Sequence, residues 1–288
     1  MNCRLSSRAA TKRHASSSRR RELVSIRLDV ALAERGLARS RSHAAELIST
    51  GLVSVDGAPA RKAATKVRED SVITVADNGG WVSRAAVKLV AGLEASGVNP
   101  ADRVALDLGT STGGFAQVLL ERGAEAVLGI EVGHGQLAAE LRNEPRLKLA
   151  EGVNARDLTP ETLARVTGDA RIPDLVVADL SFISLKLVLA AAIECAAPDA
   201  DFLLLVKPQF EVGRKGIREG IVTDPALRVD AVTDVLWVAH DLGLGVCGVY
   251  ASPIAGGSGN REAIVWLRRG ESTQPGEVSA AVTAAVAG

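Results

Sequence analysis

The stretch RVALDLGTSTGGF (Arg103–Phe115) joins an apolar segment, typical of a buried β-strand, to a turn of small residues. Glycines in such a turn let the backbone approach a ligand closely, and ligands of α/β sheets bind beyond the strand ends. Strand-like and helix-like segments alternate downstream, and the apolar runs DLVVADL and FLLLVKP predict strands covered on both faces. The sequence therefore predicts a doubly wound α/β fold. We expect strands at 103–108, 127–131, 147–150, 174–178, 202–206, 246–251 and 262–267, and helices at 114–122, 134–141, 185–196 and 225–241.

Two familiar motifs do not fit this turn, and a third fits it literally. A P-loop requires lysine after Gly114, where Phe115 stands, and a dinucleotide fingerprint requires glycine in place of Ser111. Residues 109–113 do match the Gly-x-Ser-x-Gly nucleophile elbow of hydrolases. A hydrolase also needs a histidine on a late loop, but His240 falls within an expected helix. A hydrolase is therefore the weaker alternative.

A site for S-adenosylmethionine explains more of the pattern. Asp107 ends the first strand, the small residues after it can approach a methionine group, and Glu131 ends the next strand, where an acid can accept both ribose hydroxyls. The segment EGVNARDL, residues 151–158, follows the third strand and is expected to line the adenine side. The candidate cofactor-binding residues are Asp107, Gly109, Ser111, Thr112, Gly113, Gly114, Phe115, Glu131, Asn154, Ala155 and Asp179.

Four charged residues occupy positions where a stable core would prefer apolar ones. Asp179 and Lys207 follow strands, Glu262 opens the segment EAIVWL, and Lys88 lies in the helix-like segment SRAAVKLVAGL. Buried charges are costly unless they are partnered. The four residues are therefore candidates for one network at the rim of the sheet.

The net charge of zero hides an uneven distribution. Of the 34 Lys/Arg and 34 Asp/Glu residues, 17 and 8 lie within residues 1–88, which leaves 17 and 26 for the remainder. A basic N-terminal third predicts contact with a polyanion, and nucleic acid is the first candidate.

The chain divides into five expected segments: a disordered basic tail (1–24), a small domain (25–77), a linker (78–82), a large domain (83–270) and a flexible Ala/Gly/Ser-rich tail (271–288). The Ser/Arg-rich start is interpreted as a basic arm, with an organellar transit peptide as the alternative, so we expect a cytoplasmic protein. The apolar run at residues 187–197 is shorter than the roughly 20 residues that a membrane-spanning helix needs. Cys3, Cys195 and Cys247 are far apart and lack the spacing of a metal site.

The segment RLDVALAERGLARSRSHAAELISTGLVSVDG (Arg27–Gly57) combines two helical patterns with a strand and an Asp-Gly turn. It resembles the S4 RNA-binding domain, and the similarity extends to about residue 76. This resemblance implies contacts to structured RNA, mainly through phosphates. The candidate RNA-binding residues are Arg27, Arg35, Arg39, Arg41, His43, Arg61 and Lys62 in this region, with Arg84 beyond it.

The segments WVSRAAVKL, DLGTSTGGF, EVGHGQL, VADLSFISL, LVKPQFEVG and GNREAIVWL follow in this order. Together they resemble the TlyA-type family of ribosomal RNA 2′-O-ribose methyltransferases, long known as hemolysins. The resemblance implies a Rossmann-like class I methyltransferase sheet behind an α+β S4-like domain, with S-adenosylmethionine as cofactor. It also implies a catalytic tetrad of Lys88, Asp179, Lys207 and Glu262. Glu131 and His134 depart from the family, which often has aspartate and an aromatic residue there.

The implied substrate is a cytidine 2′-hydroxyl of small-subunit rRNA, with large-subunit rRNA as a second candidate, so the expected partners are ribosomal RNA and subunits, without a membrane or a metal. A ribose hydroxyl is a weak acid and must lose its proton as it attacks a methyl group. Lys207 is the candidate base, with Lys88 as the alternative. Desolvation would favour a neutral amine, whereas the two carboxylates oppose this. Two further hypotheses remain: a membrane-active hemolysin and a noncatalytic ribosome-binding assembly factor.

Overall fold

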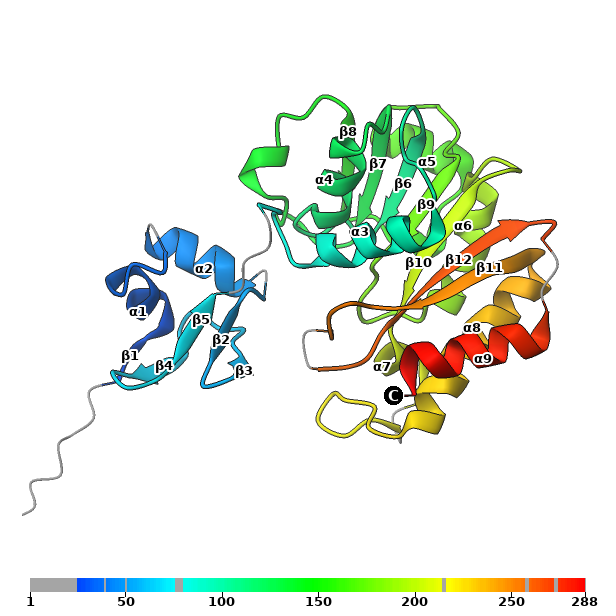
Figure 1. Ribbon diagram of the computed structural model, residues 1–288. Coiled ribbons are helices and arrows are strands. Elements are labelled where there is room, and N and C mark those ends of the chain that lie inside the picture. The colour runs from blue at the N-terminus through cyan, green and yellow to red at the C-terminus, as the bar shows by residue number, and fades with distance from the viewer. Residues whose placement is uncertain are drawn as a thin grey trace, which may run out of the picture.

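The computed structural model describes residues 25–38, 40–49, 51–75, 80–213, 216–256, 259–271 and 274–287. A small N-terminal domain lies beside a larger α/β domain (Figure 1). The predicted basic tail, residues 1–24, lies outside the described residues, as do residues 78 and 79 of the predicted linker. The five predicted segment boundaries therefore stay predictions, except for the C-terminal segment considered below.

The small domain begins with the two helices that the apolar spacing predicted, α1 (Leu28–Glu34) and α2 (Arg41–Ser49). Gly36 has a φ of 70° and lies just after α1, and the Ser40 hydroxyl accepts a hydrogen bond from His43 N at the start of α2. Two small antiparallel sheets complete the domain. Their strands are β1 (Ser25–Arg27) with β4 (Lys66–Arg68), and β3 (Ala58–Pro59), β2 (Val53–Val55) and β5 (Ile73–Val75).

The large domain contains a seven-stranded sheet in the order β11-β12-β10-β9-β6-β7-β8. Five strands are parallel: β6 (Val104–Leu108), β7 (Ala126–Glu131), β8 (Leu147–Glu151), β9 (Leu175–Ala178) and β10 (Asp201–Val206). β12 (Ala263–Arg269) pairs antiparallel with β10 and with β11 (Leu244–Ala251). The doubly wound sheet predicted from the sequence is confirmed.

Helices cover both faces of this sheet, as the continuous apolar strands require. Figure 1 shows α3 (Ala85–Ser96) and α4 (Gly114–Glu121) in front of the sheet, where they pack against residues such as Ala105 and Val127. The alternate residues, such as Leu106 and Leu128, face the opposite layer. That layer contains α5 (Pro160–Thr167), α6 (Leu189–Cys195), α8 (Pro225–Asp241) and α9 (Pro275–Val286).

Short helical turns connect the strands at the edge where the parallel strands end. They are η1 (Ala139–Leu141), η2 (Ala155–Asp157), η3 (Leu185–Leu187) and α7 (Pro208–Glu211). The predicted helix at 134–141 is wrong, because only η1 forms there. Gly133 N and Gly135 N donate instead to the carboxylates of Glu131 and Glu151, which hold this segment as a loop between two strand ends.

The prediction of a flexible tail at 271–288 is also wrong. Residues 275–286 form α9, whose Val282 and Val286 are fully buried against the core. The buried guanidinium of Arg228 in α8 donates to the backbone oxygens of Val286 at 2.6 Å and Ala287 at 3.1 Å. It also donates to the oxygens of Val222 and Thr223. Arg228 thus satisfies carbonyl groups at the end of α9 that the helix itself leaves free.

Candidate active site

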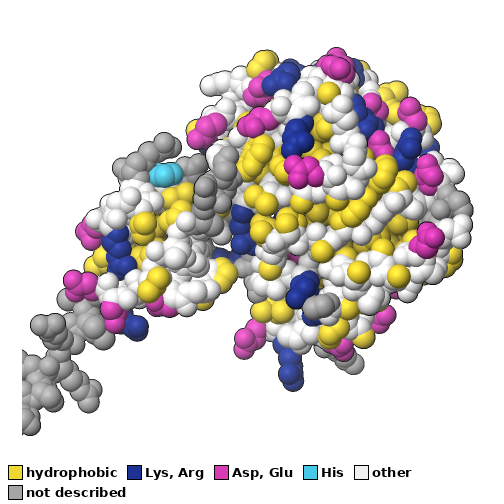
Figure 2. Space-filling model, in the orientation of Figure 1, with side chains coloured by type: hydrophobic (Ala, Val, Ile, Leu, Met, Phe, Trp, Pro, Cys, Tyr) yellow, Lys and Arg dark blue, Asp and Glu magenta, His cyan; other side chains and the backbone are white. Residues whose placement is uncertain are grey.

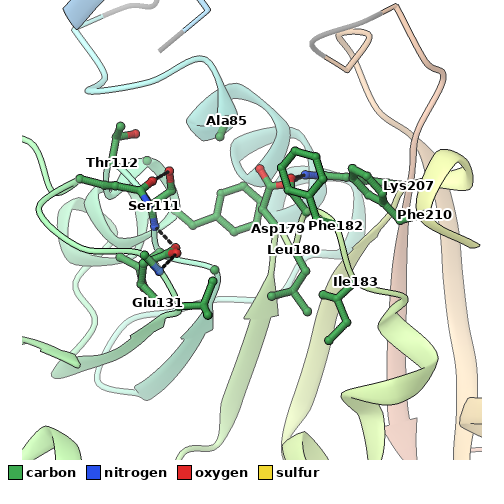
Figure 3. A pocket seen from close by; sticks show the side chains of 18 of the residues that line it. Ala85, Ser111, Thr112, Glu131, Asp179, Leu180, Phe182, Ile183, Lys207 and Phe210 are labelled. Carbon is green, nitrogen blue, oxygen red and sulfur yellow. Dashed lines mark hydrogen bonds and ion pairs between the residues drawn. The ribbon is translucent and has the colours of Figure 1, made fainter. Parts of the chain in front are cut away.

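A cavity of about 920 Å³ opens at the edge where the parallel strands end. Most of its wall comes from the loops after β6, β7, β8, β9 and β10, and the small domain contributes Gly51 and Arg61. Figure 3 shows Ser111 and Glu131 toward one end of this cavity and Asp179 and Lys207 toward the other. The cavity therefore lies where ligands of doubly wound sheets bind.

The glycine turn after β6 forms one wall, and its backbone explains its composition. Gly109 has a φ of 85°, and a Cβ there would lie 3.0 Å from the backbone oxygen of Asp179. Gly113 has a φ of 93°, and a Cβ there would overlap the side chain of Leu141. These two positions require glycine because of both conformation and space.

Glu131 at the end of β7 is held in place by this turn and by the loop that follows β7. Its Oε2 accepts a hydrogen bond from Ser111 N at 2.9 Å, and its Oε1 accepts one from Gly133 N at 2.7 Å. A carboxylate oxygen has a second lone pair, so each oxygen can still accept a hydroxyl group of a ligand. The carboxylate is thus fixed at the cavity wall in a form suited to a pair of neighbouring hydroxyls.

Two further predicted cofactor residues lie on the loop after β8. Asn154 and Ala155 both line the cavity, as do Thr112 and Phe115 from the glycine turn. The side chain of Asn154 accepts a hydrogen bond from Arg156 N at 3.1 Å and caps η2. This bond fixes the amide while its nitrogen stays available as a donor.

Like Gly113, Asp107 is a predicted cofactor residue that does not line the cavity. It is fully buried, and neither carboxylate oxygen has a hydrogen-bond partner among the described residues. The Thr110 hydroxyl donates to the backbone oxygen of Asp107 rather than to its carboxylate. Burial raises the pKa of Asp107 to about 7.

The four predicted catalytic residues form two ion pairs on the cavity wall. Lys88 Nζ lies 2.6 Å from Glu262 Oε2, and Lys207 Nζ lies 2.5 Å from Asp179 Oδ1. Lys88 belongs to α3, Asp179 and Lys207 follow β9 and β10, and Glu262 precedes β12. Because β12 is antiparallel to β10, its first residue lies at the edge where β10 ends. The structure therefore brings all four residues together.

The two ion pairs are well shielded from solvent. The side chains of Lys88 and Glu262 are 6% and 1% exposed, and those of Lys207 and Asp179 are also largely buried. Burial acts to raise the pKa of Asp179, but the charges of Lys207 and Lys88 together hold that pKa below its ordinary value. Asp179 is thus an ionised acid that faces two amines, and Figure 3 shows it directed at Lys207.

Sequence reasoning missed the contacts that join the two loops bearing Asp179 and Lys207. Lys207 Nζ donates to the Ser181 hydroxyl at 2.9 Å. Glu211, four residues after Lys207, accepts hydrogen bonds from the Ser184 hydroxyl at 2.5 Å and from Leu185 N at 2.7 Å. The only sequence signal for these contacts was Glu211 itself, an acid close to the LVKPQF segment. An acid at such a position is equally compatible with an exposed surface residue.

The FtsJ-like methyltransferase family matches residues 81–269, and the S4 domain matches residues 26–73. The first match covers more than half of the chain and contains the glycine turn and all four residues of the ion pairs.

The chain belongs to the FtsJ-like methyltransferase family.

Relatives that cover most of the chain place it among the TlyA-type members. It is 52% identical over 245 residues to the "16S/23S rRNA (cytidine-2'-O)-methyltransferase TlyA" of Mycobacterium tuberculosis, covering 84% of this chain and 89% of that protein. It is 35% identical over 239 residues to "Hemolysin A" of Brachyspira hyodysenteriae, with coverage of 82% and 97%. A solved structure of a putative hemolysin from Streptococcus thermophilus shares 32% identity, with a TM-score of 0.70 and coverage of 91% and 96%.

The candidate RNA-binding cations of this FtsJ-like protein have different surroundings. Arg35 donates to the backbone oxygens of Ser71 at 2.6 Å, Arg68 at 2.9 Å and Glu69 at 3.1 Å, so its guanidinium links parts of the small domain. Arg27 and Arg41 both bind the buried carboxylate of Asp29 and hold its pKa well below the ordinary value. Arg61 and Arg84 line the cavity, whereas the exposed Lys62 does not. Arg39 lies outside the described residues. RNA binding by these cations stays a prediction.

The hydrolase alternative finds no support in this FtsJ-like site. The Ser111 hydroxyl donates to Gln136 Oε1 at 3.0 Å, and no histidine is among the described residues that line the cavity. His240 lies in α8 with its side chain half exposed. Ser111 thus lacks the neighbouring base that a nucleophilic serine needs.

Proposed function

We propose that this protein transfers a methyl group from S-adenosylmethionine to a ribose 2′-hydroxyl of ribosomal RNA. One observation supports this most: the two ion pairs, Lys88–Glu262 and Lys207–Asp179, share one cavity with the glycine turn and Glu131. Polar groups that can orient a hydroxyl therefore lie beside groups that can hold a nucleoside cofactor. The name of the M. tuberculosis relative supports the same reaction.

The described residues fit S-adenosylmethionine. The glycine turn leaves space for the methionine part, Glu131 presents fixed acceptors for the two ribose hydroxyls, and Asn154 and Ala155 would contact the adenine. The cavity of about 920 Å³ is larger than one cofactor of this size needs and leaves room for a nucleotide. When bound, the cofactor supplies a methyl group on a positively charged sulfur.

The tetrad would act on the hydroxyl rather than on the cofactor. Lys207 is the proposed base, because its amine lies at the end of β10 between Asp179 and the Ser181 hydroxyl on the cavity wall. Lys88 is held by Glu262, and together they would position the ribose. Holding the hydroxyl in line with a methyl group contributes much of the rate of such a transfer, and accepting the proton adds to it.

The substrate would be a cytidine in rRNA of the small subunit, with the large subunit as a second candidate, as the name of the M. tuberculosis relative indicates for that protein. The S4 domain, residues 26–73, would bind structured rRNA or ribosomal subunits mainly through phosphates. A cytoplasmic location is part of this proposal, because ribosomal subunits are assembled there.

Retention of tritiated methyl groups on RNA tests the proposal. Purified protein is incubated with tritiated S-adenosylmethionine and with rRNA transcripts or isolated subunits of both sizes, and the modified nucleotide is then mapped. We expect a 2′-O-methylcytidine, loss of transfer in Lys207→Ala, and normal transfer in Lys148→Ala, whose side chain does not line the cavity. Methylation of a base would contradict the proposal, and full transfer by Lys207→Ala would rule out Lys207 as the proton acceptor.

Two further measurements, of RNA binding and of liposome leakage, separate the two alternatives. RNA binding without methyl transfer would indicate a noncatalytic assembly factor, and leakage of liposomes caused by the pure protein would indicate a membrane-active hemolysin. In the described part of the chain, no helix combines the length and the apolar character needed to cross a membrane.

A further inference from the structure

Arg61 and Arg84 come from different domains but line the same cavity. Arg61 lies in the small domain between β3 and β4, and Arg84 immediately precedes α3 in the large domain. A Cβ built on Gly51 of the small domain would lie 3.6 Å from Cδ and Nε of Arg84, which is van der Waals contact. The two domains therefore meet at Arg84, and Figure 2 shows Lys/Arg side chains in the hollow where they meet.

The positive charge at this position is not neutralised by the described residues. Arg84 donates through Nη2 to the backbone oxygen of Ala255 at 2.8 Å and forms no ion pair with a described carboxylate. Arg61 forms none either, and its side chain is exposed. Asp179 and Glu262 are near enough to influence Arg84, but each is already paired with a lysine.

Two cations held near each other, neither of them in an ion pair with a described carboxylate, repel each other unless an anion joins them. Arg84 is partly buried, and burial lowers its pKa; the charges of Glu262 and Asp179 oppose this shift, whereas the charge of Arg61 adds to it. A phosphate group would relieve this repulsion, because a guanidinium offers paired N–H donors that match phosphate oxygens. The cavity thus contains two groups of charged residues. The tetrad consists of two ion pairs, whereas Arg61 and Arg84 have no ion-pair partner among the described residues.

The position of Arg84 on α3 limits which phosphate could bind. Arg84 and Lys88 are four residues apart at the start of one helix, so their Cβ atoms are about 5–6 Å apart on the same side. Lys88 belongs to the tetrad that would hold the target ribose. An anion bound at Arg84 would therefore be within the span of one nucleotide from that ribose.

We propose that Arg61 and Arg84 together bind one phosphate of the substrate RNA, the phosphate next to the ribose that is methylated. This inference rests on the proposed function, because the tetrad marks the position of that ribose. The small domain would then contribute directly to the reaction cleft and close it over the target nucleotide. Phosphate contacts carry no sequence information, so this pair would position the RNA without selecting the base.

Fluorescence anisotropy with labelled penta-cytidylate, a single-stranded RNA probe, tests the shared phosphate. We compare the full-length protein with Arg61→Gln, Arg84→Gln and the double variant over a range of salt concentrations. Lys66→Gln and Arg165→Gln are the controls, because each removes one exposed cation that does not line the cavity. Thermal unfolding verifies that every variant is folded.

Each single variant is expected to bind about tenfold more weakly, as for loss of a charged hydrogen bond. Its slope of log K against log salt should be shallower by about 0.7, the value for one phosphate of a single strand. Both residues would bind the same phosphate. The loss of affinity in the double variant should therefore be far smaller than the product of the two single losses, and its salt slope should equal that of the single variants. The two controls should bind like the wild type.

The proposal would be overturned if the loss of affinity in the double variant equalled the product of the two single losses. It would also be overturned if either single variant bound the RNA as tightly as the wild type. Equal losses in the two controls would also overturn it, since they would indicate a diffuse charge effect. Binding is measured without methyl transfer, so the two proposals can fail separately. A wild-type protein that shows the shared site but transfers no methyl group would contradict only the proposed function.

Discussion

The carboxylate of Glu211 accepts a hydrogen bond from the Ser184 hydroxyl at 2.5 Å and so joins the loop after β10 to the loop after β9. The same loops contain Lys207 and Asp179, which form an ion pair. Each of these two residues lies several positions before the residue of its loop that makes the Glu211–Ser184 contact. The side chain of Glu211 is almost fully buried, and it also accepts a hydrogen bond from Leu185 N. The distance between Lys207 and Asp179 is therefore expected to depend on this contact outside the tetrad.

Replacing Glu211 with alanine should lower kcat more than it weakens cofactor binding. The two loops would lose their connection, and a displacement of about 1 Å at a reacting group can cost about a hundredfold in rate. We expect a reduction of about tenfold to a hundredfold in methyl transfer, with the Kd for S-adenosylmethionine from calorimetry nearly unchanged. Glu211→Gln can keep both hydrogen bonds and should recover most of the activity. Wild-type kcat in Glu211→Ala would show that the contact does not position the tetrad.

The Lys88–Glu262 pair allows stability and activity to be separated. Lys88→Met alone leaves a buried carboxylate without its partner and should lower the free energy of unfolding by about 3–5 kcal/mol. The double variant Lys88→Met/Glu262→Leu removes both charges and should recover most of this stability while staying inactive. Urea unfolding and methyl transfer measure the two effects. Activity in the double variant would exclude both residues from catalysis.

Asp107 should make the protein less stable as pH rises toward neutrality. Its folded pKa of about 7 is higher than the ordinary value of 3.8, so between these values the folded protein holds a proton that the unfolded chain releases. The free energy of unfolding should therefore fall between about pH 4 and pH 7, by at most roughly 4 kcal/mol from this group. Relative to the wild type, Asp107→Asn should gain stability as pH rises in urea unfolding experiments. A difference that stays constant with pH would refute this role for burial.

A methyl group at Gly114 should disturb the start of α3. A Cβ there would overlap the Ser83 hydroxyl, which accepts a hydrogen bond from Ala85 N. Gly114→Ala should therefore lower the free energy of unfolding by about 1–3 kcal/mol. Adding Ser83→Ala provides space and should recover part of the loss, as measured by thermal or urea unfolding. Equal stability of Gly114→Ala and the wild type would show that the two helices can separate without cost.

The sequence predicted the parts of this site that follow from strand order. Asp179 and Lys207 end parallel strands and Glu262 opens an antiparallel one, so their meeting at one edge follows from the fold. Lys88 was different, because its helix precedes the first strand of the sheet and no rule of strand order places it. Its charge within an apolar helical pattern marked it as a candidate, and the family resemblance assigned it to the tetrad.

What the sequence did not predict depends on contacts between distant segments. The link from Glu211 to Ser184 and the use of Arg35 inside the small domain leave no local pattern. Two helices that were not predicted, α5 and α9, do have local signals in the sequence. Thr159 caps α5 and Pro160 begins it, whereas α9 has valines at 278, 282 and 286 on one side behind Pro275. The small-residue composition of the C-terminal segment concealed that spacing.

The four carbonyl contacts of Arg228 connect the C-terminal helix to the segment at Val222, which lies near the tetrad residue Glu262 through Asn260. Val222, one of the residues whose oxygen Arg228 binds, is held through its N–H by Asn260, two positions before Glu262. Proteolytic trimming of the last helix would strip this cation of two acceptors and loosen the segment around Val222. A preparation clipped near residue 275 could thus look intact on a gel and still have lost its activity.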